Sequence, residues 1–215
     1  MGLPRFTQKR THAELLSYFN REWRSADTPP WGVLAEDPVE VQKAEWLIPH
    51  MGSVRSVMDF GCGGGDFLGL LTPRTNIERA VGIDLADKAV ERATQSGLYE
   101  RVVRAHLETA REHFEGKFDL LLFGEVLYYL HDYEKLLTTM IDSFLAPEGI
   151  VFIAAAVGRD YFKRRDVERM RGILEQRGMQ QLVDDTIDYK YFGVPRRMFL
   201  ICSQNYKWVL VYQAR

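Results

Sequence analysis

The N-terminal part of the chain shows the spacing of two amphipathic helices. In THAELLSYFNREW, apolar residues recur every three or four positions, which predicts a helix over residues 11–23. The segment SADTPPWG interrupts this pattern, because proline and glycine end regular structure. A second helix is predicted through DPVEVQKAEWLIPHM, with Asp37 as its N-cap and Pro38 in its first turn.

After Gly52 the pattern changes to short apolar runs that alternate with helical segments. The runs that predict strands are SVRSVMDF, RAVGIDL, RVVRAH, FDLLLFG and GIVFIAAAV. The predicted helices lie near residues 65–72, 86–97, 133–145 and 163–178. This alternation predicts an α/β fold, with a doubly wound, mostly parallel sheet covered on both faces. The tail has further strand patterns without a long helix between them, so at least one pair there should be antiparallel.

Composition and charge limit the kinds of partner. A chain of 215 residues with 46% hydrophobic residues can bury one full core, so we expect one globular domain. Its 28 basic and 30 acidic residues nearly cancel, which gives no overall field for nucleic acid or an anionic membrane. Cys62 and Cys202 are too far apart for a metal motif, and the chain starts without an apolar signal core. We therefore expect a cytoplasmic protein with a small-molecule partner and no metal.

Four glycines spread over five positions follow the first strand of this alternation, in DFGCGGGDF. In a doubly wound sheet, ligands bind where the first strand turns into its helix. Because Gly61, Gly63 and Gly65 carry no side chains, a ligand can lie against main-chain N–H groups there. Asp84 ends the next strand 23 residues after Gly61, where a carboxylate can accept hydrogen bonds from both hydroxyls of a ribose. The loop and Asp84 together predict a nucleoside site.

Two aspartates indicate which kind of nucleoside binds. A dinucleotide fingerprint needs glycine or alanine at its third loop position, and this chain has Asp66 there. Asp59, before the first glycine, would repel phosphates but could orient the loop or bind an ammonium group. A cofactor with a ribose, an amino-acid end and a positive centre therefore fits better than one with phosphates. A dinucleotide oxidoreductase is disfavoured for the same reason.

Four segments, VMDFGCGGGDF, VGIDLADKAVERA, FDLLLFGEVLYYL and LAPEGIVFI, occur in an order and spacing that resembles class I S-adenosylmethionine-dependent methyltransferases. The stretch FGEVLYYLHD, with PPWGVLAEDPVEVQKAEWL upstream, is most similar to nodulation methyltransferases that N-methylate an amino sugar. The resemblance implies a seven-stranded, Rossmann-like methyltransferase domain over residues 35–215, with an antiparallel C-terminal strand. Residues 1–34 would form an N-terminal helical lid with a hinge at TPPWG. The tryptophans Trp23, Trp31 and Trp46 suit either a lid or a core.

The resemblance also implies a set of cofactor-binding residues, namely Asp59, Gly61, Cys62, Gly63, Asp84, Leu85, His106, Leu107, Gly124 and Glu125. Asp59 and the glycine loop would hold the methionine end of S-adenosylmethionine, and Asp84 its ribose. Leu85 would pack on the adenine, and His106 would lie near the polar edge of the adenine. Many relatives carry an acid at the position of His106, so the adenine amine would be recognised differently here.

Catalytic candidates follow the fourth strand of the alternation. Methyl transfer is an in-line displacement, so the protein must align a nucleophile in a dry site. Glu125, Tyr128 or His131 could orient an amine or take its proton. Glu125 could equally be an ion-paired carboxylate, and His131 an exposed histidine where Asp132 begins a helix. Aromatic and basic residues of DYKYFGVPRRMF, residues 188–199, would wall the acceptor pocket or pack a surface loop.

We therefore predict methyl transfer to a small-molecule amine, with an amino sugar as one such acceptor and S-adenosylhomocysteine as the product. One alternative is O-methylation of a small metabolite. Another is a catalytically silent nucleoside-binding module that serves as a partner subunit. We expect a monomer or a homodimer.

Overall fold

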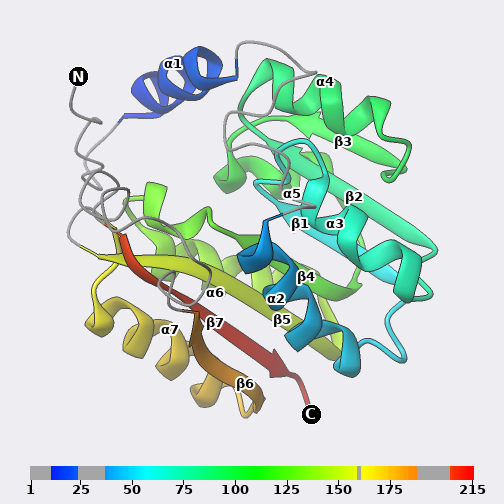
Figure 1. The fold of residues 1–215 in the computed structure, drawn as a ribbon, viewed down its shortest axis with the longest axis vertical. Coiled ribbons are helices and arrows are strands. Elements are labelled where there is room, and N and C mark those ends of the chain that lie inside the picture. The colour runs from blue at the N-terminus through cyan, green and yellow to red at the C-terminus, as the bar shows by residue number, and fades with distance from the viewer. Residues whose placement is uncertain (1–10, 24–36, 159–160, 188–203) are drawn as a thin grey trace.

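The computed structural model describes residues 11–23, 37–158, 161–187 and 204–215. Within these residues, one sheet holds seven strands in the order β3-β2-β1-β4-β5-β7-β6 (Figure 1). The strands are β1 (Ser56–Phe60), β2 (Arg79–Asp84), β3 (Arg101–Arg104), β4 (Phe118–Gly124), β5 (Leu145–Gly158), β6 (Gln180–Ile187) and β7 (Gln204–Gln213). The helices are α1 (His12–Glu22), α2 (Pro38–Leu47), α3 (Asp66–Leu71), α4 (Asp87–Gln95), α5 (Ala110–His113), α6 (Tyr133–Phe144) and α7 (Arg164–Gln176).

The sheet is parallel from β3 to β5 and antiparallel where β7 enters it. Strands β1, β2, β3, β4 and β5 pair in parallel, because each is followed by a helical connection that returns the chain to the same edge. Strand β7 pairs antiparallel with both β5 and β6. The predicted doubly wound α/β fold with an antiparallel C-terminal strand is therefore confirmed. No helix in the described part of the chain is long and apolar enough to span a membrane.

The two faces of the sheet carry separate apolar cores, because successive residues of a strand point to opposite faces. One core packs against α5, α6 and α7 and includes Phe60 and Phe123, whose rings stack with centroids 4.6 Å apart. The other packs against α2 and α3 and includes Val57, Leu122 and Phe152. Each such buried side chain contributes about 1.5 to 3 kcal/mol of apolar burial. The carboxyl ends of β1, β2 and β4 lie between these cores at one edge.

Helix α1 docks at that edge beside α4, as Figure 1 shows. A capping box begins it, in which the side chain of Thr11 accepts from the backbone N–H of Glu14. Near the other end, Asn20 accepts from the backbone N–H of Asp87 (3.0 Å), which satisfies a free donor at the start of α4. Trp23 is 4% exposed, and it packs in a small cluster with two alanines at the start of α4, Ala86 and Ala89.

The predicted helix at residues 11–23 is thus confirmed as an element. The TPPWG segment, Trp31 and residues 188–199 lie outside the described residues, and Trp46 packs half-buried against the α2 and α3 core.

Candidate functional site

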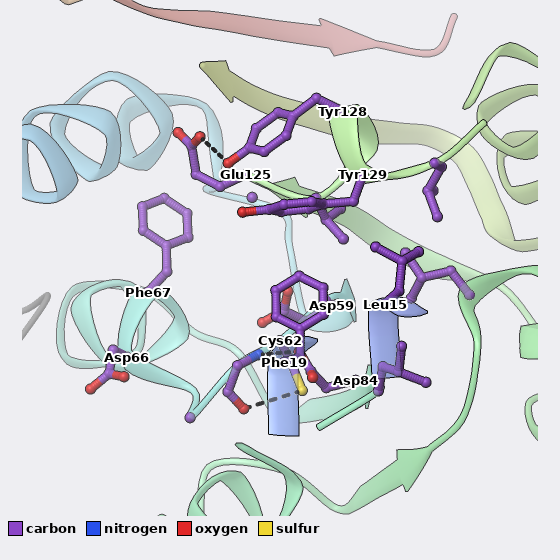
Figure 2. A pocket seen from close by; sticks show the side chains of 18 of the residues that line it. Leu15, Phe19, Asp59, Cys62, Asp66, Phe67, Asp84, Glu125, Tyr128 and Tyr129 are labelled. Carbon is purple, nitrogen blue, oxygen red and sulfur yellow. Dashed lines mark hydrogen bonds between the residues drawn. The ribbon is translucent and has the colours of Figure 1, made fainter. Parts of the chain in front are cut away.

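A cavity of about 460 Å³ lies at the carboxyl edge of the sheet, between α1 and the strand ends (Figure 2). Its floor is the glycine loop that joins β1 to α3. Its walls come from α1, α2, the turn after β4, and β7. Aromatic side chains from α1, from α3 and from the turn after β4 face into it, including Tyr18, Phe19, Phe67, Tyr128 and Tyr129. The cavity is therefore built from segments that are far apart in the sequence.

The glycine loop exposes bare backbone to this cavity. Gly61 has φ +73°, and a Cβ there would lie 2.5 Å from Cγ2 of Val126, so no larger residue fits without a shift. Gly63 has φ +54° and also lines the cavity. A ligand can thus approach the main chain of the loop directly.

Asp84 stands at the end of β2 and is held by two backbone donors. Its Oδ2 accepts from the N–H of Gly63 (2.9 Å) and its Oδ1 accepts from the N–H of Ala86 (2.9 Å). Burial raises the pKa of Asp84, and these hydrogen bonds oppose part of that rise. Each carboxylate oxygen retains lone-pair capacity for a further donor. The side chain can therefore accept hydroxyl groups of a sugar that lies on the loop.

Asp59 lies near the end of β1 with only 6% of its surface exposed. The hydroxyl of Tyr99 donates to its Oδ2 at 2.7 Å. Burial raises the pKa of Asp59 to about 7, although the Tyr99 bond lowers it, and the charge of nearby Asp84 adds to the rise. Two acids in one buried region leave negative charge that the described side chains do not neutralise. A cationic ligand at this point would lower the pKa again.

Glu125 follows β4 and is the centre of a charged group at the far end of the cavity. Its backbone is left-handed (φ 58°), which costs about 1 to 3 kcal/mol for a residue other than glycine. Its Oε2 lies 2.5 Å from Nζ of Lys207 and accepts from the hydroxyl of Tyr128 (3.0 Å). Its Oε1 lies 3.5 Å from Nζ of Lys43, which in turn pairs with Glu40 at 2.6 Å.

The surroundings of Glu125 keep it ionised. Burial alone would raise its pKa, but the ammonium groups of Lys207 and Lys43 and the hydrogen bonds outweigh burial and lower it. Oε1 of Glu125 is buried and has no hydrogen-bond partner among the described residues, apart from the ion-pair contact with Lys43. This oxygen therefore keeps lone-pair capacity that no described donor uses. The low pKa makes the side chain a poor general base.

The charges around the whole cavity favour positive ligands. Eight acidic residues line it, namely Glu22, Asp37, Glu40, Asp59, Asp66, Asp84, Glu108 and Glu125. The lysines in the lining are Lys43 and Lys207. In a partly closed site this excess of carboxylates attracts cations more strongly than it would in open water.

Comparison with known proteins assigns the family. A profile of the methyltransferase domain matches residues 14–187, which is most of the chain. The chain belongs to this methyltransferase family. The predicted class I methyltransferase is thus confirmed, and S-adenosylmethionine is its cofactor.

Two curated relatives of the methyltransferase share about a third of its sequence over part of its length. One is the ribosomal protein L11 methyltransferase of Burkholderia orbicola, 32% identical over 54% of this chain and 36% of its own length. Another is nodulation protein S of Bradyrhizobium diazoefficiens, 29% identical over 49% of this chain and 51% of its own length. The chain therefore spans about a third to a half of these relatives.

A solved structure confirms the fold of the methyltransferase. The N-methyltransferase NodS of Bradyrhizobium japonicum WM9, in complex with S-adenosylhomocysteine, superposes with a TM-score of 0.66 and 22% identity. The superposition covers 91% of this chain and 97% of that chain. At this identity the likeness concerns the fold.

The structure places all ten residues predicted to bind the cofactor around the cavity of the methyltransferase. They are Asp59, Gly61, Cys62, Gly63, Asp84, Leu85, His106, Leu107, Gly124 and Glu125. Of the three catalytic candidates, Glu125 and Tyr128 line the cavity and are hydrogen-bonded to each other. His131 does not: it is exposed and absent from the lining, because the chain turns away through the short helix Leu127–Tyr129. Asp132 takes the N-cap position of α6 without a side-chain cap bond.

Sequence reasoning missed the two lysines of the charged group. Along β7, Lys207 lies on the same face as Val209 and Val211, which are both fully buried. Lys43 lies one turn from Val39 and from Leu47 on the buried side of α2. Both lysines could have been found from the sequence, because each stands at a position that the periodicity of its helix or strand assigns to the core. An ammonium is rarely buried without a partner, so such a position predicts an ion pair.

Proposed function

We propose that this methyltransferase N-methylates a small-molecule amine. The observation that carries the proposal is the acceptor end of the cavity, which Glu125 lines in an ionised state and where one of its oxygens has no hydrogen-bond partner among the described residues. An amine has N–H groups to donate there, and the excess of carboxylates favours its cationic form on entry. The relative with a matching fold is named as an N-methyltransferase, which agrees with this choice of acceptor atom.

The residues at the other end of the cavity fit the cofactor. When bound, S-adenosylmethionine supplies a methyl carbon activated by the neighbouring sulfonium. We propose that Asp84 accepts the ribose hydroxyls and that Asp59, with the N–H groups of the glycine loop, holds the amino-acid end. The raised pKa of Asp59 supports this role, because an ammonium would offset the unmatched charge of the two aspartates. Leu85 and His106 line the cavity where the adenine is expected.

Glu125 and Tyr128 are proposed to orient the acceptor rather than to take its proton. A carboxylate whose pKa is lowered by two lysines has little tendency to accept a proton at neutral pH. Burial also raises the pKa of Tyr128 well above its ordinary value, so its hydroxyl remains a donor. The amine would lose its proton to water before it enters the near-attack position.

Residues 1–34 are proposed as a lid, since Leu15 and Phe19 of α1 line the cavity.

The test is an acceptor screen with two variants. The protein is incubated with S-adenosylmethionine and with amines, amino sugars or hydroxyl compounds, and both S-adenosylhomocysteine and the methylated acceptor are quantified. We expect amines to react and kcat/KM for them to fall about 10- to 100-fold in Glu125→Gln, the worth of a charged hydrogen bond. The matched control is Glu91→Gln on the exposed face of α4, which should leave kcat/KM unchanged. Turnover of hydroxyl compounds alone would favour O-methylation. Cofactor binding without any turnover would favour a silent subunit.

A second candidate acceptor is a protein amine. The relative at 32% identity is named as a ribosomal protein methyltransferase. Lysine-containing peptides therefore belong in the same screen. Methylated peptide without methylated small amines would replace the small-molecule proposal.

A further inference from the structure

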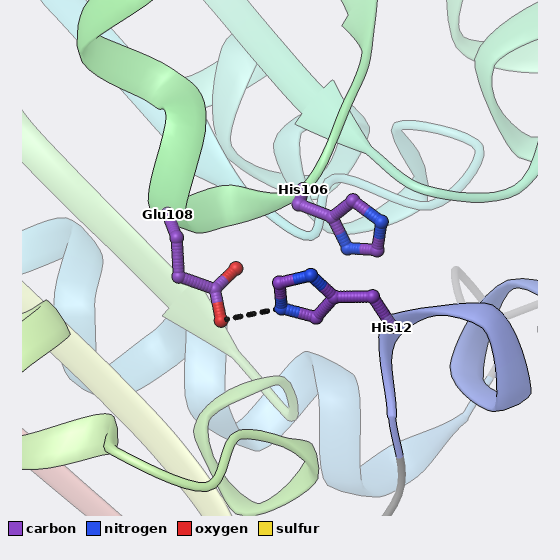
Figure 3. A group of neighbouring side chains, drawn as sticks. All are labelled: His12, His106 and Glu108. Carbon is purple, nitrogen blue, oxygen red and sulfur yellow. Dashed lines mark hydrogen bonds and ion pairs between the residues drawn. The ribbon is translucent and has the colours of Figure 1, made fainter.

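Figure 3 shows a group of three potential metal ligands, two of which line the cavity. His12 comes from the first turn of α1, and His106 and Glu108 come from the connection that follows β3. Nε2 of His12 lies 3.3 Å from Oε1 of Glu108, and the rings of His12 and His106 stack with centroids 4.0 Å apart. One ligand atom from each residue lies within 4.8 Å of the other two. Among the described residues, this is the one such group of three.

We propose that His12, His106 and Glu108 bind a divalent transition-metal ion of the zinc type. Two imidazoles and a carboxylate suit zinc, cobalt(II) and nickel, whereas magnesium and calcium prefer sites made of oxygen ligands. Three protein ligands leave at least one position for water. The reaction needs no such ion. His106 and Glu108 line the cavity at the end where the adenine is expected, so the ion would lie near the bound cofactor without taking part in methyl transfer.

Distances support this assignment. With zinc–nitrogen and zinc–oxygen bonds of about 2.0 to 2.1 Å, two ligands of a tetrahedral ion lie about 3.3 to 3.4 Å apart. The separation of 3.3 Å between His12 and Glu108 already matches this value. His106 must turn out of the ring stack, because parallel rings cannot both direct a lone pair at one ion.

Two of the three ligands are exposed enough to change position. The side chains of His12 and Glu108 are 57% and 41% exposed, so both can move towards His106.

The position of the group gives the ion a mechanical consequence. The C-terminal end of α1 is already fixed to α4 through Asn20 and Trp23. An ion at His12 would fix the other end of α1 to the connection after β3. Leu15 and Phe19, one and two turns along α1, line the cofactor cavity. The metal would therefore hold α1 over the cavity and slow the release of what is bound there.

The first test measures metal binding itself and does not depend on the proposed function. Tag-free protein is treated with a chelator and titrated with zinc by calorimetry and with cobalt(II) by visible absorption. We expect one ion per chain. We also expect His12→Gln and Glu108→Gln to weaken binding at least about tenfold, since losing even a residue that supports a ligand costs 10- to 100-fold. The matched control His113→Gln also removes one histidine and should bind as the wild type does.

Three results would overturn the site. These are no binding of either metal, unchanged affinity in both His12→Gln and Glu108→Gln, or an equal loss in His113→Gln, which would indicate adventitious binding. Far-ultraviolet circular dichroism of the metal-free variants checks that they remain folded. His12 and Glu108 are exposed enough for both substitutions to be tolerated.

The second test concerns the hold on α1 and rests on the proposed lid. The release rate of S-adenosylhomocysteine is measured by stopped flow with and without zinc. Slower release with zinc in the wild type, but not in His12→Gln, would support the inference that the metal holds α1 over the cavity. Equal rates in a protein that binds zinc would overturn the hold on α1. Failure to bind S-adenosylhomocysteine at all would instead contradict the proposed function, while the zinc titration would still stand.

Discussion

Replacing Lys207 by methionine tests whether the charged group at Glu125 is held by its ion pairs. Methionine keeps the apolar stem of the side chain but removes the ammonium that lies 2.5 Å from Oε2 of Glu125. Lys207 and Glu125 expose only 9% and 21% of their side chains, so solvent screens the pair little. Breaking a buried pair by removing one partner costs about 3 to 5 kcal/mol. Lys43 and Tyr128 still contact Glu125, so we expect the lower end, about 3 kcal/mol.

The loss of stability in Lys207→Met should depend on pH, and the pKa of Glu125 determines whether this loss grows or shrinks as the pH rises. In the wild type, the pKa of Glu125 is lower in the folded state than in the unfolded state. The ionised side chain therefore stabilises the fold at pH values above the unfolded-state pKa, and this stabilisation is lost as the pH falls through the folded-state pKa. Without Lys207, burial dominates and the pKa of Glu125 rises. The variant can then take up a proton and relieve the unpaired charge in mild acid. The difference in stability from the wild type should therefore be larger at pH 7 than at pH 5.

Urea unfolding, followed by tryptophan fluorescence at both pH values, measures this difference. A loss of about 3 kcal/mol corresponds to a fall in Tm of about 6 to 12 °C for a chain of this size. The control is Lys88→Met, which breaks an exposed pair with Glu91 and should cost less than about 1 kcal/mol. Equal losses in the two variants, or a Lys207→Met penalty that is the same at pH 5 and pH 7, would refute the reasoning.

Three further predictions concern the cofactor end of the cavity. Asp84→Ala should lower affinity for S-adenosylhomocysteine about 10- to 100-fold by calorimetry, and NAD should not stabilise either protein in a thermal-shift assay. Wild-type affinity for S-adenosylhomocysteine should rise as the pH passes through about 7 and Asp59 ionises, and Asp59→Asn should remove that rise. Because the folded pKa is raised from 3.8 to about 7, the free protein should lose stability as the pH rises between these two values. Gly61→Ala should cost about 2 to 4 kcal/mol in urea unfolding, from its positive φ and the clash with Val126, and adding Val126→Ala should restore the packing part.

The elements that carry the cofactor site could be predicted from the sequence because their signals are local. The glycines after β1 and Asp84 at the end of β2 stand at fixed distances along the chain, and the fold brings parallel strand ends to one edge. The ten predicted cofactor residues therefore all reach the cavity. His131 did not, since the direction of the chain after β4 depends on the short helix that packs there.

The sequence by itself determined the order of helices and strands, the parallel sheet and the glycine loop, because periodicity and glycine act within a few residues. Only the tertiary structure decided that Lys43 and Lys207 meet Glu125, and that His12 lies on His106. A buried lysine is visible in a pattern as a position on a buried face. The partner of that lysine cannot be read from the pattern, because the partner depends on how helices and strands from distant parts of the chain pack together. The left-handed backbone of Glu125 likewise depends on the tertiary structure, since surrounding contacts and not local preference hold it in that conformation.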